Sequence, residues 1–181
     1  MPTHVPAEDH GDEAGALLAF LEAQRGGLRR ALLGLTDAQA AERPSASELS
    51  LAGLVKHAAE TEQGWLETAQ QRPSSVARTP ETWHLSFRLE DGETPAGVLE
   101  FWDGVARRTE EFIRSVPSLN DTFPLPAMPW YPDGARQSMR WLLLHLIEEM
   151  ARHAGHADIL RESLDGKTAF ELVEEEEKAR V

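Results

Sequence analysis

The sequence contains no cysteine among its 181 residues. This absence excludes disulfide bonds, a zinc–thiolate site and a cysteine nucleophile supplied by the chain. Any metal ion would have to be held by histidine, aspartate or glutamate side chains.

Basic residues are also scarce. Lysine and arginine total 18 against 31 acidic residues, so that the net charge is −13 at pH 7. A nucleic acid or an anionic membrane must be met by clustered basic side chains. The charge balance therefore argues against both kinds of partner and leaves a small-molecule substrate and a homodimer open.

Long apolar runs are missing as well. No segment approaches the roughly 20 apolar residues that cross a bilayer, and the first residues, "MPTHVPAEDHGDE", lack the basic start and apolar stretch of a signal peptide. We expect a cytoplasmic protein. A hydrophobic content of 41% over this length predicts one domain with a substantial core.

Proline and polar clusters divide the sequence into four long predicted helices. Helical spacing of apolar residues and capping residues place them at residues 13–35, 51–70, 95–116 and 137–164. Two long loops connect them, at 71–94 and 117–136, and "TWHLSFRL" is a candidate extended piece in the first loop. Four such helices predict an all-α four-helix bundle.

The bundle is expected to span residues 13–166. Residues 1–12 contain two prolines and little apolar content, which is typical of a flexible N-terminal arm. Residues 167–181 end in "EEEEKARV" and are predicted to form a short acidic tail helix.

Three of the seven histidines lie in "HLIEEMARHAGHADILRE" at 145–162. Measured from the centre of the helix's apolar stripe, His153 lies about 45° away, Glu149 about 85°, His156 about 105° and His145 about 125°. His153 therefore points into the bundle, and Glu149 lies at the edge of the stripe.

Residues four apart on a helix are neighbours, so Glu149 and His153 are the favoured chelating pair. A hydrogen-bonded core histidine is an equally good interpretation of His153 alone. His145 and His156 are interpreted as solvated, as supporting the ligands, or as alternative ligands. A metal site needs a third ligand from another helix.

Two segments carry a resemblance: "SLAGLVKHAAETEQGWL" at 50–66 and "SMRWLLLHLIEEMARHAGHADILRESLDG" at 138–166. Together they resemble the DinB-like superfamily of metal-binding four-helix bundles, and an uncharacterised actinobacterial branch in particular. The resemblance implies one divalent metal ion, usually zinc or nickel, with His57, Glu149 and His153 as ligands. Most relatives carry histidine where this chain has Glu149, and a carboxylate also suits zinc, nickel or iron.

Periodicity does not select His57, which lies well off the apolar stripe of its helix, so its role rests on the resemblance. Glu62 falls inside that stripe, and a buried carboxylate needs a partner. Two interpretations are equally weighted for Glu62: a contact that supports a ligating histidine, and an internal salt bridge.

The resemblance also implies an activity. Characterised relatives include transferases and isomerases in which a low-molecular-weight thiol, such as mycothiol or bacillithiol, binds the metal and attacks as a thiolate. A chain without cysteine fits this chemistry, because the thiol comes from the cosubstrate. A metal-dependent hydrolase and a non-catalytic metal-stabilised binding protein are the alternatives. Trp83, Trp130 and Tyr131 of the two loops would line the substrate pocket, or would simply cap the bundle.

Overall fold

The computed structural model describes residues 12–76 and 78–179. The predicted N-terminal arm lies outside the described residues except for Asp12, which caps the first helix. The elements, in chain order, are α1 (Glu13–Arg30), α2 (Asp37–Ala41), α3 (Leu51–Ala69), the 3₁₀ helix η1 (Trp83–Phe87), α4 (Pro95–Ser115), β1 (Thr122–Pro124), β2 (Arg136–Ser138), α5 (Met139–Asp165) and α6 (Ala169–Ala179).

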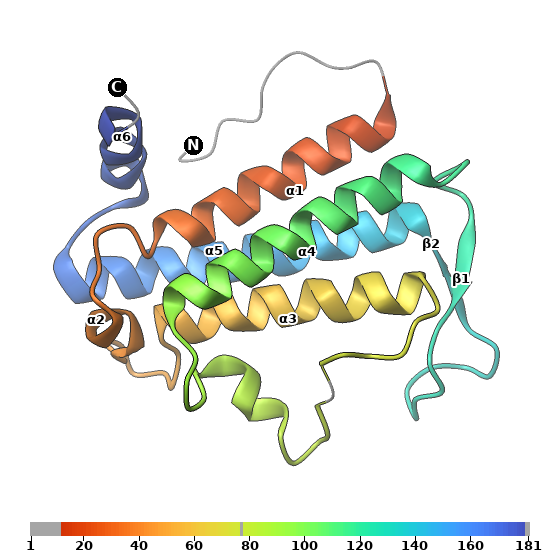
Figure 1. Cartoon of the computed structure of the whole chain (residues 1–181), viewed down its shortest axis with the longest axis horizontal. Coiled ribbons are helices and arrows are strands. Elements are labelled where there is room, and N and C mark those ends of the chain that lie inside the picture. The colour runs from red at the N-terminus through yellow and green to blue at the C-terminus, as the bar shows by residue number, and fades with distance from the viewer. Residues whose placement is uncertain (1–11, 77, 180–181) are drawn as a thin grey trace.

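Helices α1, α3, α4 and α5 lie side by side as a four-helix bundle, with α6 at one end and the β1–β2 pair at the other (Figure 1). Helix α1 packs on α5, and α3 packs on both α4 and α5. Fully buried side chains from all four helices fill the centre: Leu21, Leu28, Leu54, Trp102, Leu142, Leu143 and Leu146. The predicted all-α bundle is confirmed. Among the described residues, no helix is long and apolar enough to cross a membrane.

Capping residues set the start of the helices that matter for the site. The Ser50 hydroxyl accepts from the Gly53 amide at 3.1 Å at the start of α3, and Ser138 accepts from the Trp141 amide at 3.1 Å at the start of α5. Gly166, with φ of 81°, ends α5 in the left-handed conformation that glycine adopts without strain. These local signals explain why the predicted helix starts lie within two residues of the observed ones.

Helix α1 is shorter than predicted, since the expected 13–35 helix ends at Arg30. The buried Arg161 guanidinium donates from Nη1 to the carbonyl oxygens of Ala31 and Leu33, at 2.8 and 2.9 Å. This long-range contact satisfies carbonyl groups that a continuing helix would have used itself.

The two predicted loops contain more structure than expected. The "TWHLSFRL" segment forms the 3₁₀ helix η1 instead of an extended piece. The second loop contains a short antiparallel pair in which Phe123 faces Gln137 in register. As a result, α5 begins at Met139, two residues after the predicted start.

Glu62 forms an ion pair inside the bundle. Its side chain is fully buried, and its carboxylate accepts from Arg25 Nε at 3.0 Å and from Trp102 Nε1 at 2.9 Å. The three side chains join α1, α3 and α4. The internal salt bridge, one of the two interpretations of Glu62, is therefore present in the structure.

Candidate metal centre

His57 from α3 meets Glu149 and His153 from α5. One ligand atom from each of the three side chains lies within 4.8 Å of the other two. His57 and His153 are buried, while Glu149 is partly exposed. His153 Nε2 lies 3.6 Å from Glu149 Oε2, as expected for side chains one helical turn apart. The three residues that the resemblance implies as ligands are thus brought together.

The burial of His57 has a tertiary cause. Every residue of α3 from Leu51 to Ala59 is buried, including Lys56 and His57. The other bundle helices cover one side of this part of α3, and η1 packs on α3 from outside the bundle (Figure 1). An apolar stripe cannot predict this, because the second covering segment comes from a loop about 30 residues later.

The 3₁₀ helix η1 orients the His57 ring. The Phe87 ring stacks on His57 with centroids 3.9 Å apart and an interplanar angle of 17°. The Ser86 hydroxyl lies 3.1 Å from His57 Nδ1, and the Trp83 ring approaches edge-on at 6.3 Å. Sequence reasoning missed Ser86 and Phe87, because no periodic signal marks a contact made by a loop.

Burial keeps both histidines neutral near pH 7. Together with a smaller effect of the nearby His153 imidazole, it lowers the pKa of His57 to about 4. Burial also lowers the pKa of His153, against the opposing effect of the Glu149 carboxylate. A neutral imidazole is the form that binds a metal ion.

The three side chains fit a divalent cation. Within the described part of the chain, His153 Nδ1 is buried without a hydrogen-bond partner. A buried polar atom without a partner is costly, and a nearby cation or water would relieve that cost. Two imidazoles and one carboxylate are a donor set for zinc, nickel or iron that leaves coordination positions open.

The other two α5 histidines lie outside this three-residue cluster. The His145 ring stacks on Trp141 at 4.7 Å and meets Trp65 edge-on at 4.8 Å. The His156 ring lies 5.5 Å from that of His153. Both positions agree with their angular distance from the apolar stripe.

A pocket of about 460 Å³ opens beside the cluster. His57 and Glu149 line it, together with aromatic side chains from α3 and both long loops: Trp65, Trp83, Trp130 and Tyr131. Trp83 and Trp130 are 56% and 67% exposed, so a ligand in the pocket would find apolar surface that water now covers. The three predicted wall residues all line this pocket.

This fold, with a His/Glu/His cluster between its second and last long helices, is that of a DinB-like protein. The crystal structure of a conserved protein from Enterococcus faecalis superposes with a TM-score of 0.68 over 86% of this chain and 99% of that chain, at 13% identity. At that identity the likeness shows the fold alone.

The sequence pattern of the mycothiol S-transferase family matches residues 16–166. The chain therefore belongs to the mycothiol S-transferase family. No curated protein matches the sequence of this chain.

Proposed function

We propose that this protein is a divalent-metal-dependent transferase that uses mycothiol or a similar low-molecular-weight thiol as cosubstrate. The observation that carries the proposal is the convergence of His57, Glu149 and His153 within 4.8 Å beside an aromatic-lined pocket. Membership of the mycothiol S-transferase family supports the thiol.

The roles of the side chains follow from their chemistry. His57 and His153 would bind the ion, zinc or nickel being the expected choices, through neutral imidazole nitrogens, and Glu149 would add one negative charge. When bound, such an ion lowers the pKa of a coordinated thiol, as it lowers that of water. With a divalent ion bound, two neutral imidazoles and one carboxylate would leave the site with a net positive charge, which would favour an anionic sulfur.

The pocket would hold the electrophile. Trp83, Trp130 and Tyr131 offer apolar surface that would cover its carbon skeleton and keep water from competing with the thiol. In a substitution, the sulfur forms a bond to the electrophilic carbon, the leaving group departs with its bonding pair, and the thiol proton passes to solvent.

Metal content is the first test. Protein purified without chelators should carry one divalent ion per chain by elemental analysis, and His57→Ala or His153→Ala should lose it, because two remaining ligands rarely hold a metal against water. The matched controls, His145→Gln and His156→Gln, should keep the metal. Stoichiometric metal in the first pair, or its loss in the second, would contradict the ligand assignment.

Turnover is the second test. The metal-loaded protein is incubated with a panel of alkyl and epoxide electrophiles, with and without mycothiol. The proposal expects electrophile consumption that needs both the metal and the thiol and yields a thioether. Consumption with metal but without thiol would instead assign a metal-activated hydrolase.

A further inference from the structure

The Ser86 side chain connects η1 to the candidate ligand His57. Ser86 is only 3% exposed, and its hydroxyl lies 3.1 Å from His57 Nδ1 and 2.8 Å from the carbonyl oxygen of Trp83. Both distances are those of hydrogen bonds. Unlike Glu62, Ser86 therefore contacts the candidate metal centre directly.

The hydrogen count of this arrangement fixes the donor of each bond. The Trp83 carbonyl can only accept, so it takes the single hydrogen of the Ser86 hydroxyl. The Ser86 oxygen must then accept a hydrogen from His57 Nδ1. A neutral imidazole has one N–H and one lone pair, so the lone pair of His57 lies on Nε2.

We infer that Ser86 is a positioning residue that holds His57 in the Nδ1–H tautomer and so presents the Nε2 lone pair for metal binding. The inference rests on the proposed metal site, and it adds a residue that neither the fold nor the family match identifies. A hydrogen bond to the second ring nitrogen is the general means by which proteins orient a ligating histidine.

A glycine in α3, Gly53, allows η1 to pack closely against the helix backbone. A Cβ atom at Gly53, one turn before His57, would lie 1.9 Å from the Phe87 carbonyl oxygen. No real side chain tolerates that distance, so η1 can reach its observed position only where α3 has no side chain. The same approach brings the Phe87 ring onto His57.

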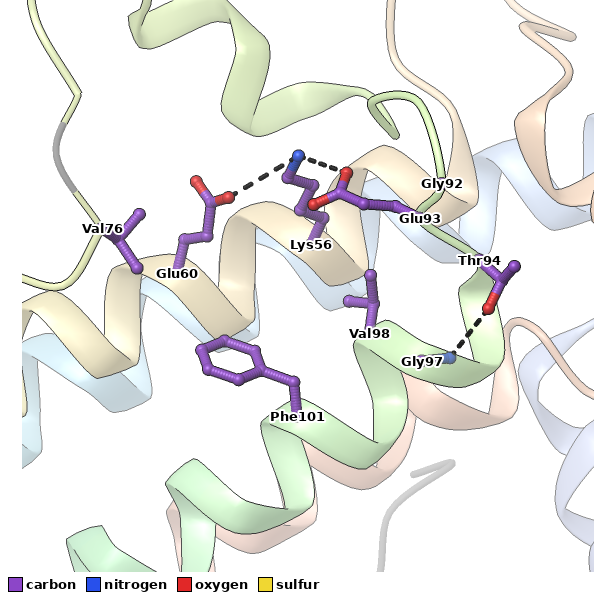
Figure 2. A pocket seen from close by; sticks show the side chains of 9 residues that line it. All are labelled: Lys56, Glu60, Val76, Gly92, Glu93, Thr94, Gly97, Val98 and Phe101. Atoms are coloured by element: carbon purple, nitrogen blue, oxygen red, sulfur yellow. Dashed lines mark hydrogen bonds and ion pairs between the residues drawn. The ribbon is translucent and has the colours of Figure 1, made fainter.

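Ion pairs connect both ends of the η1 segment to α3. Lys56, whose side chain is 2% exposed, pairs with Glu93 and, at 3.1 Å, with Glu90, both of which follow η1. Arg78, which precedes η1, pairs with Glu60 at 2.6 Å. Figure 2 shows Lys56 and Glu60 of α3 together with Glu93, all three of which line a second pocket. The segment that carries Ser86 is thus anchored on each side.

The direct test is the tautomer of His57 in the metal-free protein. With ¹⁵N-labelled histidine, long-range proton–nitrogen correlation spectra at pH 7.5 distinguish a protonated Nδ1 from a protonated Nε2, and His57→Gln identifies the signal. We expect the Nδ1–H form in the parent protein and in Ser86→Thr, which keeps the hydroxyl. Ser86→Ala should shift the population toward Nε2–H.

The second readout is zinc affinity, measured by competition with a chelating dye. Ser86→Ala should weaken zinc binding about 10- to 100-fold, and Ser86→Thr should restore most of it. Ser115→Ala is the matched control, because the Ser115 hydroxyl also donates to a carbonyl oxygen three residues earlier, that of Phe112 at 2.7 Å, but lies exposed on α4. Thermal unfolding of each metal-free variant shows whether it is folded.

The outcomes separate this inference from the proposed function. An Nε2–H tautomer in the parent protein, or an unchanged tautomer in folded Ser86→Ala, would overturn the role of Ser86 whether or not metal binds. If the parent protein shows the Nδ1–H form and Ser86→Ala loses it, but neither binds zinc, the positioning role stands and the metal site fails.

Discussion

Glu149 determines the charge of the candidate metal centre. It would supply the one anionic donor of the three-residue cluster beside two neutral imidazoles, and it lines the pocket. Its neighbour Glu148 is 64% exposed and pairs with Arg152 on the outer surface of α5. Two adjacent carboxylates therefore have different surroundings.

Substitutions at these two positions should separate their roles. Glu149→His keeps the one-turn spacing to His153 and should bind metal with a changed preference between zinc and nickel. Glu149→Ala should weaken zinc binding at least 10-fold, while Glu148→Ala should leave it within twofold. Isothermal titration with both metals checks this, and the reverse ranking of the two alanine variants would move the carboxylate ligand to Glu148.

The low pKa of His57 predicts a pH-dependent stability. An imidazole that titrates near 6.5 in the unfolded chain and near 4 in the folded one favours folding in its neutral form. That contribution is complete above about pH 6.5 and is lost as the pH falls toward 4, because the unfolded state then binds more protons.

Urea unfolding of the chelator-treated protein at pH 7 and pH 5 measures the effect. His57 should account for a loss of about 2 kcal/mol between these values, and His57→Gln should show a smaller loss. The pH range from 7 to 5 lies above the pKa of carboxyl groups such as those of Glu90 and Asp165, whose pKa the fold lowers. An equal loss in His57→Gln would show that the histidine does not carry this dependence.

At the scale of elements, the contact between η1 and α3 connects the outer loop to the candidate metal centre. Ser86 and Phe87 hold the His57 ring from outside the bundle, while α5 supplies the other two candidate ligands from inside it. The site therefore lies between a regular helix pair and an irregular segment, and its geometry depends on how closely that segment can approach.

Gly53→Ala should disturb the site without altering any candidate ligand. The added methyl group must displace the Phe87 carbonyl, at a cost of about 1–3 kcal/mol in stability, and zinc affinity should fall with it. Gly64→Ala in the same helix is the control, since its Cβ would meet nothing within 4 Å. Thermal melts and dye competition on both variants test the prediction, which fails if Gly53→Ala binds zinc like the parent protein.

At the scale of the whole molecule, the Arg25–Glu62–Trp102 cluster joins three of the four long helices. The Arg25 and Glu62 side chains are 3% and 0% exposed, so each charge depends on neighbouring side chains for the interactions that water would provide. Arg25 also pairs with the more exposed Glu22 at 3.1 Å. The cluster belongs to the bundle and not to the pocket that adjoins the candidate metal centre.

Breaking this pair should destabilise the fold while sparing metal binding. Glu62→Gln leaves the Arg25 charge buried and should lower the free energy of unfolding by about 3–5 kcal/mol. Glu110→Gln, in the exposed pair with Arg114, should change it by less than about 1 kcal/mol. Denaturant titration gives both values, and a folded Glu62→Gln that has lost zinc would instead give Glu62 a role at the metal.

The sequence alone determined the features that depend on local spacing and composition. Capping residues and apolar periodicity located the four long helices, and the period of α5 singled out Glu149 and His153 as a pair on its inner edge. The absence of cysteine excluded a thiolate among the metal donors. The choice of His57 came from the resemblance, because no local rule marks it.

Only the tertiary structure decided the features that join distant segments. Arg161 binds carbonyl oxygens just after the end of α1, Glu62 pairs with Arg25 on another helix, and η1 covers His57 through Ser86. Each of these contacts joins residues from about 30 to 130 positions apart. Hydrophobic periodicity reports how one helix faces its surroundings, but it contains no information on which segment covers the remaining face, and that segment orients His57 beside Glu149 and His153.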